Sequence, residues 1–306
     1  MFLNVFTQVI ILLILIIAGA LLAHFKVLEE NSISGITDMV LYTVTPCVII
    51  KSFIRPFDKA LLKNLLISFL IAFLVHLGFI LMSRLIAVNE KEAQKKVLQF
   101  GTIFSNCGYM SLPLQEALLG DIGVFYGASF VAIFNLFIWS YGILLMSGDK
   151  KYLTPKKMII NPGIIGISAG LIIFLLSIPV PKVLSEPVSY IASLNTPLPM
   201  IIIGYHLYHS NLFAGMKNKQ CLISVASRLV IFPAVAVAVM YACKIRGDML
   251  VSCAISCCAP TAAITTMLSS KFSGDTQLSV SMVSISTVLS VITIPLIVAL
   301  TQIIAY

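Results

Sequence analysis

Long apolar segments separated by short polar turns run through the whole chain. Ten of these segments approach the ~20 apolar residues that an α-helix needs to cross the hydrocarbon core of a bilayer. They lie near residues 5–23, 35–54, 62–86, 97–119, 122–147, 162–181, 188–210, 220–243, 249–271 and 277–304. The turns between them are too short for a folded soluble domain. The pattern therefore predicts an all-α polytopic membrane protein with ten transmembrane helices.

The first apolar segment differs from a cleavable signal peptide. Its leading residues, MFLNVFTQ, carry no basic side chain, and the apolar run is longer than the core of a signal sequence. We therefore expect it to be retained as the first membrane helix.

The composition agrees with a membrane protein. Of the 306 residues, 59% are hydrophobic and only 10% are charged, whereas soluble domains are about 25% charged. We expect a multi-pass protein of the plasma membrane, which in bacteria is the inner membrane, in direct contact with lipid.

Lysine and arginine are distributed unevenly between the two sets of turns. If the N-terminus is outside, twelve of them fall on the cytoplasmic side and seven on the opposite side. The first set is Lys26, Arg84, Lys91, Lys95, Lys96, Lys150, Lys151, Lys156, Lys157, Lys217, Lys219 and Lys271, and the second is Lys51, Arg55, Lys59, Lys63, Lys182, Lys244 and Arg246. Cytoplasmic loops are enriched in these residues, so this distribution predicts that both termini lie outside. The basic group from Lys51 to Lys63 favours the opposite orientation.

The net charge of +8 is thus a signal of topology. A groove for single-stranded nucleic acid combines basic residues with aromatic residues on which bases stack. No basic stretch of this chain is interleaved with aromatic residues in that way, and no nucleic-acid partner is expected.

The seven cysteines favour packing over chemistry. An odd number, mostly inside apolar segments, argues against a disulfide framework. Cys253 and Cys257 share a helix face, but no histidine or carboxylate lies near them in sequence to complete a metal site. We expect small apolar packing residues, no metal and no cofactor.

Short motifs recur at a separation of about half the chain. Thr45-Pro46 has a counterpart in Thr196-Pro197, 151 residues later, and Gly120-Asp121 has one in Gly274-Asp275, 154 residues later. Each match alone is weak, because the aspartate of a Gly-Asp pair can simply cap the next helix. The shared offset indicates two five-helix repeats.

The odd number of helices in each repeat has a geometric consequence. A second copy of a five-helix unit must enter the membrane from the opposite side, so the repeats, 1–150 and 151–306, are expected to be inverted. Inverted repeats with interrupted helices in corresponding positions are typical of secondary transporters, whose site lies near the bilayer midplane.

Two of the apolar segments contain residues that interrupt helices. The stretch NCGYMSLPL, from Asn106 to Leu114, places an amide, a glycine and a proline inside the fourth segment, and Pro260 occupies the corresponding place in the ninth. Non-helical backbone persists at membrane depth only where protein buries it or where water or a ligand reaches it. The alternative is that both prolines merely kink packed helices.

Facing interruptions would form a polar site. A helix N-terminus carries about half a positive charge and free N–H groups, which suit a carboxylate. The residues expected to bind the substrate are Asn106, Cys107, Gly108, Tyr109, Pro113, Pro260, Thr261 and Thr265.

NCGYMSLPL resembles the Asn-x-Gly-Phe-x-Gly-Leu-Pro-Leu signature of the auxin efflux carrier family, which includes bacterial malonate-type carriers and the plant PIN proteins. The resemblance continues through KKMIINPGIIGISAGLIIF (156–174), SRLVIFPAV (227–235) and VSISTVLSVITIPL (283–296). It thus covers most of the chain. Tyr109 replaces the common Phe and Ser111 the common Gly, which puts the specific substrate in doubt.

The resemblance implies a ten-helix carrier with two domains. Helices one, two, six and seven would form a scaffold domain, and helices three to five and eight to ten a transport domain in which helices four and nine cross. Asn106 and the neighbouring backbone would hold the substrate carboxylate, and Pro260 would mark the second crossover. The resemblance also suggests a homodimer formed through the scaffold.

Four ionisable residues are candidates for coupling or gating. Arg228, inside the eighth segment, could attract an anion or pair with Asp38, or it could extend to the cytoplasmic interface. Glu116 could carry a proton or remain a solvated carboxylate. His76 is better explained as a hydrogen-bonded packing residue than as a proton relay.

Several polar and proline positions could line the pathway. Pro46, Asn135, Ser286, Thr287 and Ser290 have this potential, although the hydroxyl and amide groups could instead hydrogen-bond one helix to another. Oxygen ligands for sodium are sparse, so proton coupling or facilitated transport is as consistent with the sequence as sodium coupling.

The sequence favours a carrier of small organic anions, mono- or dicarboxylates of the malonate or auxin kind. An enzyme is not expected, because Gly-x-Ser-x-Gly and His-Glu-x-x-His are absent and none of the four histidines has an obvious nucleophile. A receptor that keeps the carrier fold without transport remains the alternative. The motif Gly-x-x-x-x-Gly-Lys is also absent, which argues against primary pumping.

Overall fold

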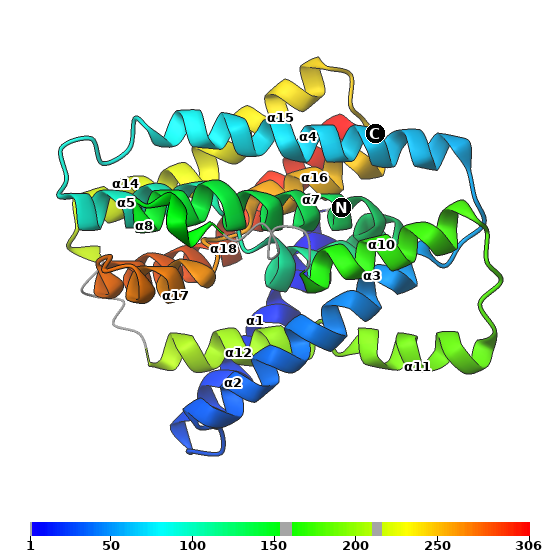
Figure 1. The fold of residues 1–306 in the computed structure, drawn as a ribbon, viewed down its shortest axis with the longest axis horizontal. Coiled ribbons are helices and arrows are strands. Elements are labelled where there is room, and N and C mark those ends of the chain that lie inside the picture. The colour runs from blue at the N-terminus through cyan, green and yellow to red at the C-terminus, as the bar shows by residue number, and fades with distance from the viewer. Residues whose placement is uncertain (1, 154–160, 210–215) are drawn as a thin grey trace.

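The computed structural model describes residues 2–153, 161–209 and 216–306, and within these ranges the chain is helical with no strand (Figure 1). In the first half the helices are α1 (Phe2–His24), α2 (Glu30–Met39), α3 (Thr45–Phe53), α4 (Lys59–Ser83), α5 (Glu92–Ile103), α6 (Leu112–Leu119), α7 (Asp121–Phe137) and α8 (Ile143–Ser147). In the second half they are α10 (Pro162–Leu175), α11 (Lys182–Ser193), α12 (Pro197–Tyr208), α14 (Lys219–Ala226), α15 (Phe232–Ala242), α16 (Gly247–Cys258), α17 (Ile264–Lys271) and α18 (Thr276–Ala305).

Short π-helical turns join several of these helices. Three of them end two residues before a proline: η1 (Val40–Val44) before Pro46, η2 (Cys107–Ser111) before Pro113 and η5 (Ser227–Ile231) before Pro233. Proline lacks an N–H and its ring displaces the carbonyl four residues earlier, so a widened turn relieves the conflict. The remaining short segments are the π turn η3 (Ile138–Gly142) and the 3₁₀ turn η4 (Lys150–Tyr152).

Six helical segments of the described residues are long and apolar enough to cross a membrane. They are Phe6–His24, Glu30–Phe53, Lys59–Ser83, Asp121–Ser147, Lys219–Ala242 and Thr276–Ala305. They coincide with predicted spans one, two, three, five, eight and ten, which confirms a polytopic membrane protein. The count of ten helices and the inverted repeat stay predictions.

The other four predicted spans are shorter or interrupted. The fourth and ninth are divided as expected, the fourth into α5 and η2–α6 and the ninth into α16 and α17. The seventh predicted span begins at 188 and is described by the structure as far as 209. It was expected to be one continuous helix, but it consists of α11 and α12 joined by a turn at 194–196. Pro197 and Pro199 follow this turn and remove two of the three main-chain donors at 197–199, which favours the start of a new helix over a helix interior.

The sixth span is also shorter than predicted. It ends as α10 at Leu175 and not near residue 181, because Pro179 and Pro181 follow at once. Residues 156–160 of the segment that resembles the family, including Lys156 and Lys157, lie outside the described residues.

Many of the helices lie roughly along one axis, whereas α1 and α2–α3 cross it obliquely (Figure 1). In Figure 1 the turns after α3 and α10 lie at the right end, and the turn after α4 lies at the left end. This arrangement is what consecutive antiparallel spans require. The assignment of the left end to the cytoplasm, and of both termini to the outside, stays a prediction.

Two sets of helices pack closely among themselves. One set pairs α1 with α12, and α3 with α10 and α11, while the other contains α4 to α8 and α14 to α18. The α1–α12 pair is the tightest, because a Cβ atom at Gly19 or Gly204 would overlap the main-chain carbonyl of Ile201 or Ile16 respectively. Small residues allow such close approach between membrane helices.

The two Gly-Asp pairs have different local roles. Asp275 caps α18, since its Oδ1 accepts a hydrogen bond of 2.9 Å from the amide of Leu278. Asp121 was expected to cap α7 in the same way, but Gly120, with φ of 64°, occupies the cap and Asp121 pairs instead with Lys51 at 3.4 Å. A carboxylate in the first helical turn still favours the positive end of the helix dipole.

Candidate functional site

The two interrupted helices meet at their interruptions. Ser105 and Thr261 form an isolated antiparallel bridge. The amide of Asn106 donates to the carbonyl of Pro260 at 2.7 Å, and the amide of Ala262 donates to the carbonyl of Phe104 at 3.0 Å. The broken backbones thus satisfy each other, as buried peptide groups must. We call this contact, residues 104–106 with 259–263, the crossover.

Side chains from α18 complete the crossover. The hydroxyl of Ser286 accepts a hydrogen bond from the amide of Thr261 at 3.1 Å, and the hydroxyl of Thr261 donates to the carbonyl of Gly101 at 3.0 Å. Thr287 lies one residue further along and donates to Val283 in its own helix. Thr261 and Ser286 are therefore at the predicted place, but they bind backbone atoms.

Replacing Thr261 by valine is expected to lower stability modestly. The isosteric change removes one buried donor and leaves the Gly101 carbonyl without this bond, a cost of about 1–3 kcal/mol. Thr261→Ser should retain most of the stability because it keeps the hydroxyl. The stabilities of the wild type and the two variants are compared by thermal inactivation in detergent. Equal stability of Thr261→Val and the wild type would contradict a stabilising role of the Thr261 hydroxyl.

Arg228 holds the C-terminal ends of both broken helices. Its guanidinium is fully buried and donates to the carbonyls of Thr102 and Ile103, each at 3.1 Å, and to that of Cys257. The last carbonyls of a helix have no partner within it, and a cation there opposes the negative end of the dipole. The centre of the Phe79 ring lies 5.0 Å from the guanidinium carbon of Arg228.

Neither the extension of Arg228 to the interface nor its pairing with an acid is seen among the described residues, and its attraction for an anion stays a prediction. A fully buried guanidinium does not extend to the interface, and none of the ion pairs among the described residues includes it. Asp38 is exposed on α2 and lies within electrostatic range of Tyr109. The sequence signal was an arginine inside an apolar segment, five residues before Pro233, and it did not reveal the carbonyl partners.

The N-terminal ends of the broken helices present polar groups without side-chain partners. Asn106 begins η2, its side chain makes no capping hydrogen bond, and it is 7% exposed. A Cβ atom at Gly108 would meet nothing within 4 Å, so space exists beside it. The hydroxyl of Thr265, near the start of α17, is buried and is among the side-chain atoms without a hydrogen-bond partner in the described structure.

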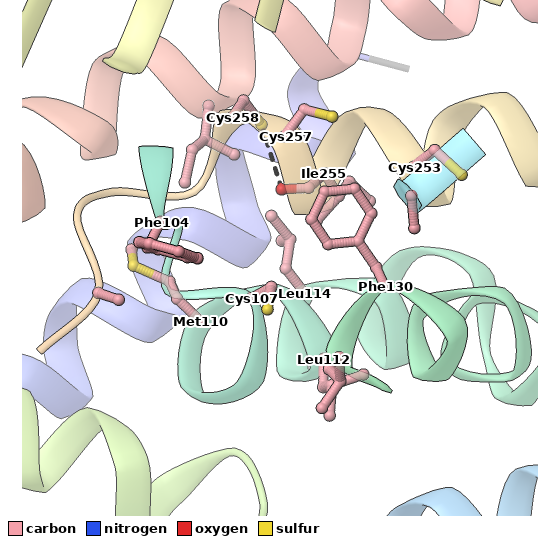
Figure 2. Close-up of a cluster of buried hydrophobic side chains, with 14 of the residues drawn as sticks. Phe104, Cys107, Met110, Leu112, Leu114, Phe130, Cys253, Ile255, Cys257 and Cys258 are labelled. Carbon is pink, nitrogen blue, oxygen red and sulfur yellow. Dashed lines mark hydrogen bonds between the residues drawn. The ribbon is translucent and has the colours of Figure 1, made fainter. Parts of the chain in front are cut away.

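The other side of the crossover is an apolar cluster. Figure 2 shows Cys107, Met110 and Leu114 from η2–α6 gathered with cysteines of α16 and with Phe104 and Phe130, whereas Leu112 points to the other side of α6. Pro113, the second residue of α6, is buried in the same region. All seven cysteines are free, and those of α16 are buried, which agrees with their interpretation as packing residues.

Two other candidates, Pro46 and Asn135, lie away from the crossover, whereas the His76 ring lies beside it, 6.3 Å from the ring of Phe104. Pro46 packs against Gly166 of α10, where an added Cβ would lie 3.0 Å from its Cα. The amide of Asn135 donates to Val131 in its own helix at 2.9 Å. His76 is buried, bonds the carbonyl of Ala72 at 2.7 Å and stacks on an aromatic ring, so it is the packing residue that the sequence favoured.

Glu116 has a partner that the sequence did not predict. Its Oε1 lies 2.9 Å from the Nζ of Lys51, which also lies 3.4 Å from Asp121. The Glu116 carboxylate is thus paired and partly exposed in this structure, and its role as a proton carrier stays a prediction. Lys51 had been considered only as a topology signal, because contacts between residues so far apart in sequence leave no local pattern.

A cavity of about 560 Å³ lies apart from the crossover. It opens between the first turns of α4, Tyr126 of α7 and the turn between α15 and α16. Its lining includes Lys63, Lys244, Arg246 and Asp248, and none of the crossover residues.

Comparison with known proteins places the chain in a family. The profile of a family described as membrane transport protein matches residues 4–298. A protein of the archaeon Methanothermobacter thermautotrophicus described as an uncharacterized transporter is 23% identical over 292 residues, which cover 94% of this chain and 95% of that protein. The match spans almost the whole chain, including both interrupted helices, and it confirms the resemblance to auxin efflux carriers. The chain therefore belongs to the membrane transport protein family.

Proposed function

We propose that the protein is a secondary-active or facilitative carrier of small organic anions, mono- or dicarboxylates, that works by alternating access at the crossover. Membership of a family of membrane transporters supports the transport activity. The observation that carries the choice of an anion is the side-chain amide of Asn106, which makes no capping hydrogen bond at the N-terminus of η2 and lies beside the open space at Gly108.

The electrostatics of the crossover favour an anion. Two helix N-termini and two helix C-termini meet there, and their partial charges would largely cancel if all were equally free. Arg228 binds carbonyls at both C-termini and adds a full positive charge. The field that remains is positive and is strongest near the free N-termini, where a carboxylate can accept hydrogen bonds from N–H groups.

The packing supports two bodies that move relative to each other. The set containing α1, α2, α3 and α10 to α12 corresponds to the scaffold that the family resemblance implies, and the other set contains the crossover. Tyr109 of η2 lies near Asp38 and Tyr42 of α2–η1, so the substrate would sit between the two bodies. Asp38 is an exposed acid beside Tyr109 and is our candidate for proton coupling.

The proposal is tested by flux measurements in proteoliposomes. Labelled malonate and labelled monocarboxylates are offered under imposed pH and sodium gradients, which also identifies the coupling ion. We expect Asn106→Ala to lower the initial rate about tenfold or more, the cost of one lost hydrogen bond to a charged ligand. Asn135→Ala is the matched control, because this side-chain amide lies away from the crossover and donates to Val131 of its own helix, and the variant should stay near the wild-type rate.

The outcomes separate the candidate functions. If the wild type moves no organic anion under any gradient, the proposed substrate class is wrong. Saturable binding of a carboxylate without flux would indicate a receptor with the carrier fold. Cross-linking of the reconstituted protein also tests the homodimer that the family resemblance suggests.

A further inference from the structure

A small cluster of charges connects the two sets of helices at one end of the molecule. Lys51, near the end of α3, reaches Glu116 of α6 at 2.9 Å and Asp121 of α7 at 3.4 Å. The Lys51 and Glu116 side chains are 29% and 22% exposed, so the pair is partly sheltered from solvent. α3 belongs to the set proposed as scaffold, whereas α6 and α7 belong to the set that contains the crossover.

A second cation and an apolar layer lie beside these charges. Arg55 follows α3, and its guanidinium carbon lies 5.0 Å from the centre of the Phe125 ring. Burial lowers the pKa of the Arg55 guanidinium, and the nearby charge of Asp121 opposes this shift. The Phe125 ring also packs against that of Phe53, with centroids 4.6 Å apart. The contact between α3 and α7 thus has a charged layer and an aromatic layer.

This contact stands between the crossover and the end of the molecule. η2–α6 leads from the crossover to Glu116, a distance of about 14 Å for nine residues of helix. A solute that moved from the crossover to this end between α3 and α6–α7 would have to pass Lys51. The sequence predicts that this end faces the outside of the cell.

We propose that Lys51, by bridging Glu116 and Asp121, is a gate that closes the path from the crossover to this end of the molecule and must release both acids when that end opens. The inference rests on the proposed function, since it assigns a residue to the transport cycle. In this structure the gate is closed.

The strength of such a contact suits a gate. A partly exposed ion pair contributes only modestly to the stability of the state that contains it, because water competes for both charges. A contact that forms only in the closed state stabilises that state relative to the open state by the free energy of the contact. Loss of an ion pair that stabilises the closed state by about 1 kcal/mol would therefore raise the population of the open state roughly fivefold.

The test measures access to the crossover without requiring a known substrate. A cysteine introduced by Gly108→Cys reports on the open space there, in a background with Cys47 and Cys243 replaced by serine because these two are not buried. A membrane-impermeant maleimide is applied from each side of membrane vesicles. We expect Lys51→Gln and Glu116→Gln each to raise the labelling rate from the α3–α6 end about fivefold.

A double-mutant cycle and a control identify the cause. If Lys51 and Glu116 act as a pair, the double variant should label little faster than either single variant, because interacting residues are not additive. Lys151→Gln removes the partner of Asp149, 2.9 Å away in an exposed turn, and should leave the labelling rate unchanged. Thermal stability of each variant, measured in detergent, separates gating from general loss of structure.

The results distinguish this inference from the proposed function. Unchanged labelling in both single variants, or the same increase in Lys151→Gln, overturns the gate even if the protein transports anions. Increased labelling in a protein that moves no anion supports the gate and overturns the carrier.

Discussion

Replacement of Arg228 by alanine is expected to lower the stability of the protein more than any other single change of a charged side chain. The variant leaves the carbonyls of Thr102, Ile103 and Cys257 buried without the guanidinium. A buried acceptor without a partner costs about 1–3 kcal/mol, so a loss of several kcal/mol is expected. The fraction of detergent-solubilised protein that remains monodisperse after heating measures the effect.

Arg228→Lys should restore only part of the loss. The Arg228 guanidinium carries donors on separate nitrogens that reach carbonyls of both α5 and α16 at once, whereas an ammonium is a single point. We therefore expect the lysine variant to lie between alanine and wild type in stability and to transport more slowly, because the crossover would be held less firmly.

The matched control for this prediction is Arg246→Ala. Arg246 also donates to two main-chain carbonyls, those of Tyr241 and Ile245, but Arg246 is exposed to solvent. Surface substitutions usually change stability by no more than about 0.5 kcal/mol. If the two alanine variants were equally stable, burial of the carbonyl contacts of Arg228 would not matter and our account of the crossover would be wrong.

Gly204→Ala is expected to have the second large effect. The added Cβ would overlap the carbonyl of Ile16 and lie 2.8 Å from the amide nitrogen of Ala20, both of which are main-chain atoms that cannot rotate away. Overfilling a tight contact typically costs about 1–3 kcal/mol, and here α1 and α12 must separate along their length. We expect low yields of folded protein, measured by size-exclusion chromatography after expression.

Gly78→Ala makes the same chemical change where space is available. Gly78 lies inside α4, and a Cβ at this position would meet nothing within 4 Å. Alanine favours helix over glycine by about 1 kcal/mol, so this variant should be as stable as the wild type or more stable. A loss similar to that of Gly204→Ala would show that the α1–α12 contact is not the cause.

The sequence predicted the parts of the fold that depend on local pattern. Apolar length revealed the six long spans, and Gly108, Pro113 and Pro260 marked the interruptions of the fourth and ninth spans. The same reasoning missed the interruption at 194–196, although Pro197 and Pro199 carry the same signal. The overall apolar length of the segment outweighed the prolines, and a single Pro46 in the corresponding span is absorbed by a π turn.

The site was less predictable because its contacts join distant parts of the chain. Asn106 and Thr261 were found from the motif and its half-chain offset. The partners of Arg228 are carbonyls on two other helices, and a carbonyl has no signature in sequence. Lys51 and Glu116 are 65 residues apart, so neither could indicate the other. Sequence thus identified which residues are unusual, and structure was needed to say what each one touches.

The joint between the two broken helices is made of peptide groups. The bonds from Asn106 to Pro260 and from Ala262 to Phe104 use only main-chain atoms, so almost any amino acid can occupy these positions without undoing them. Proline at 106 or 262 is the exception, since it has no N–H to donate. Evolution can therefore exchange the side chains that meet the cargo while the joint itself persists. Transporters that share this joint can therefore differ in their substrates, even where little sequence identity remains between them.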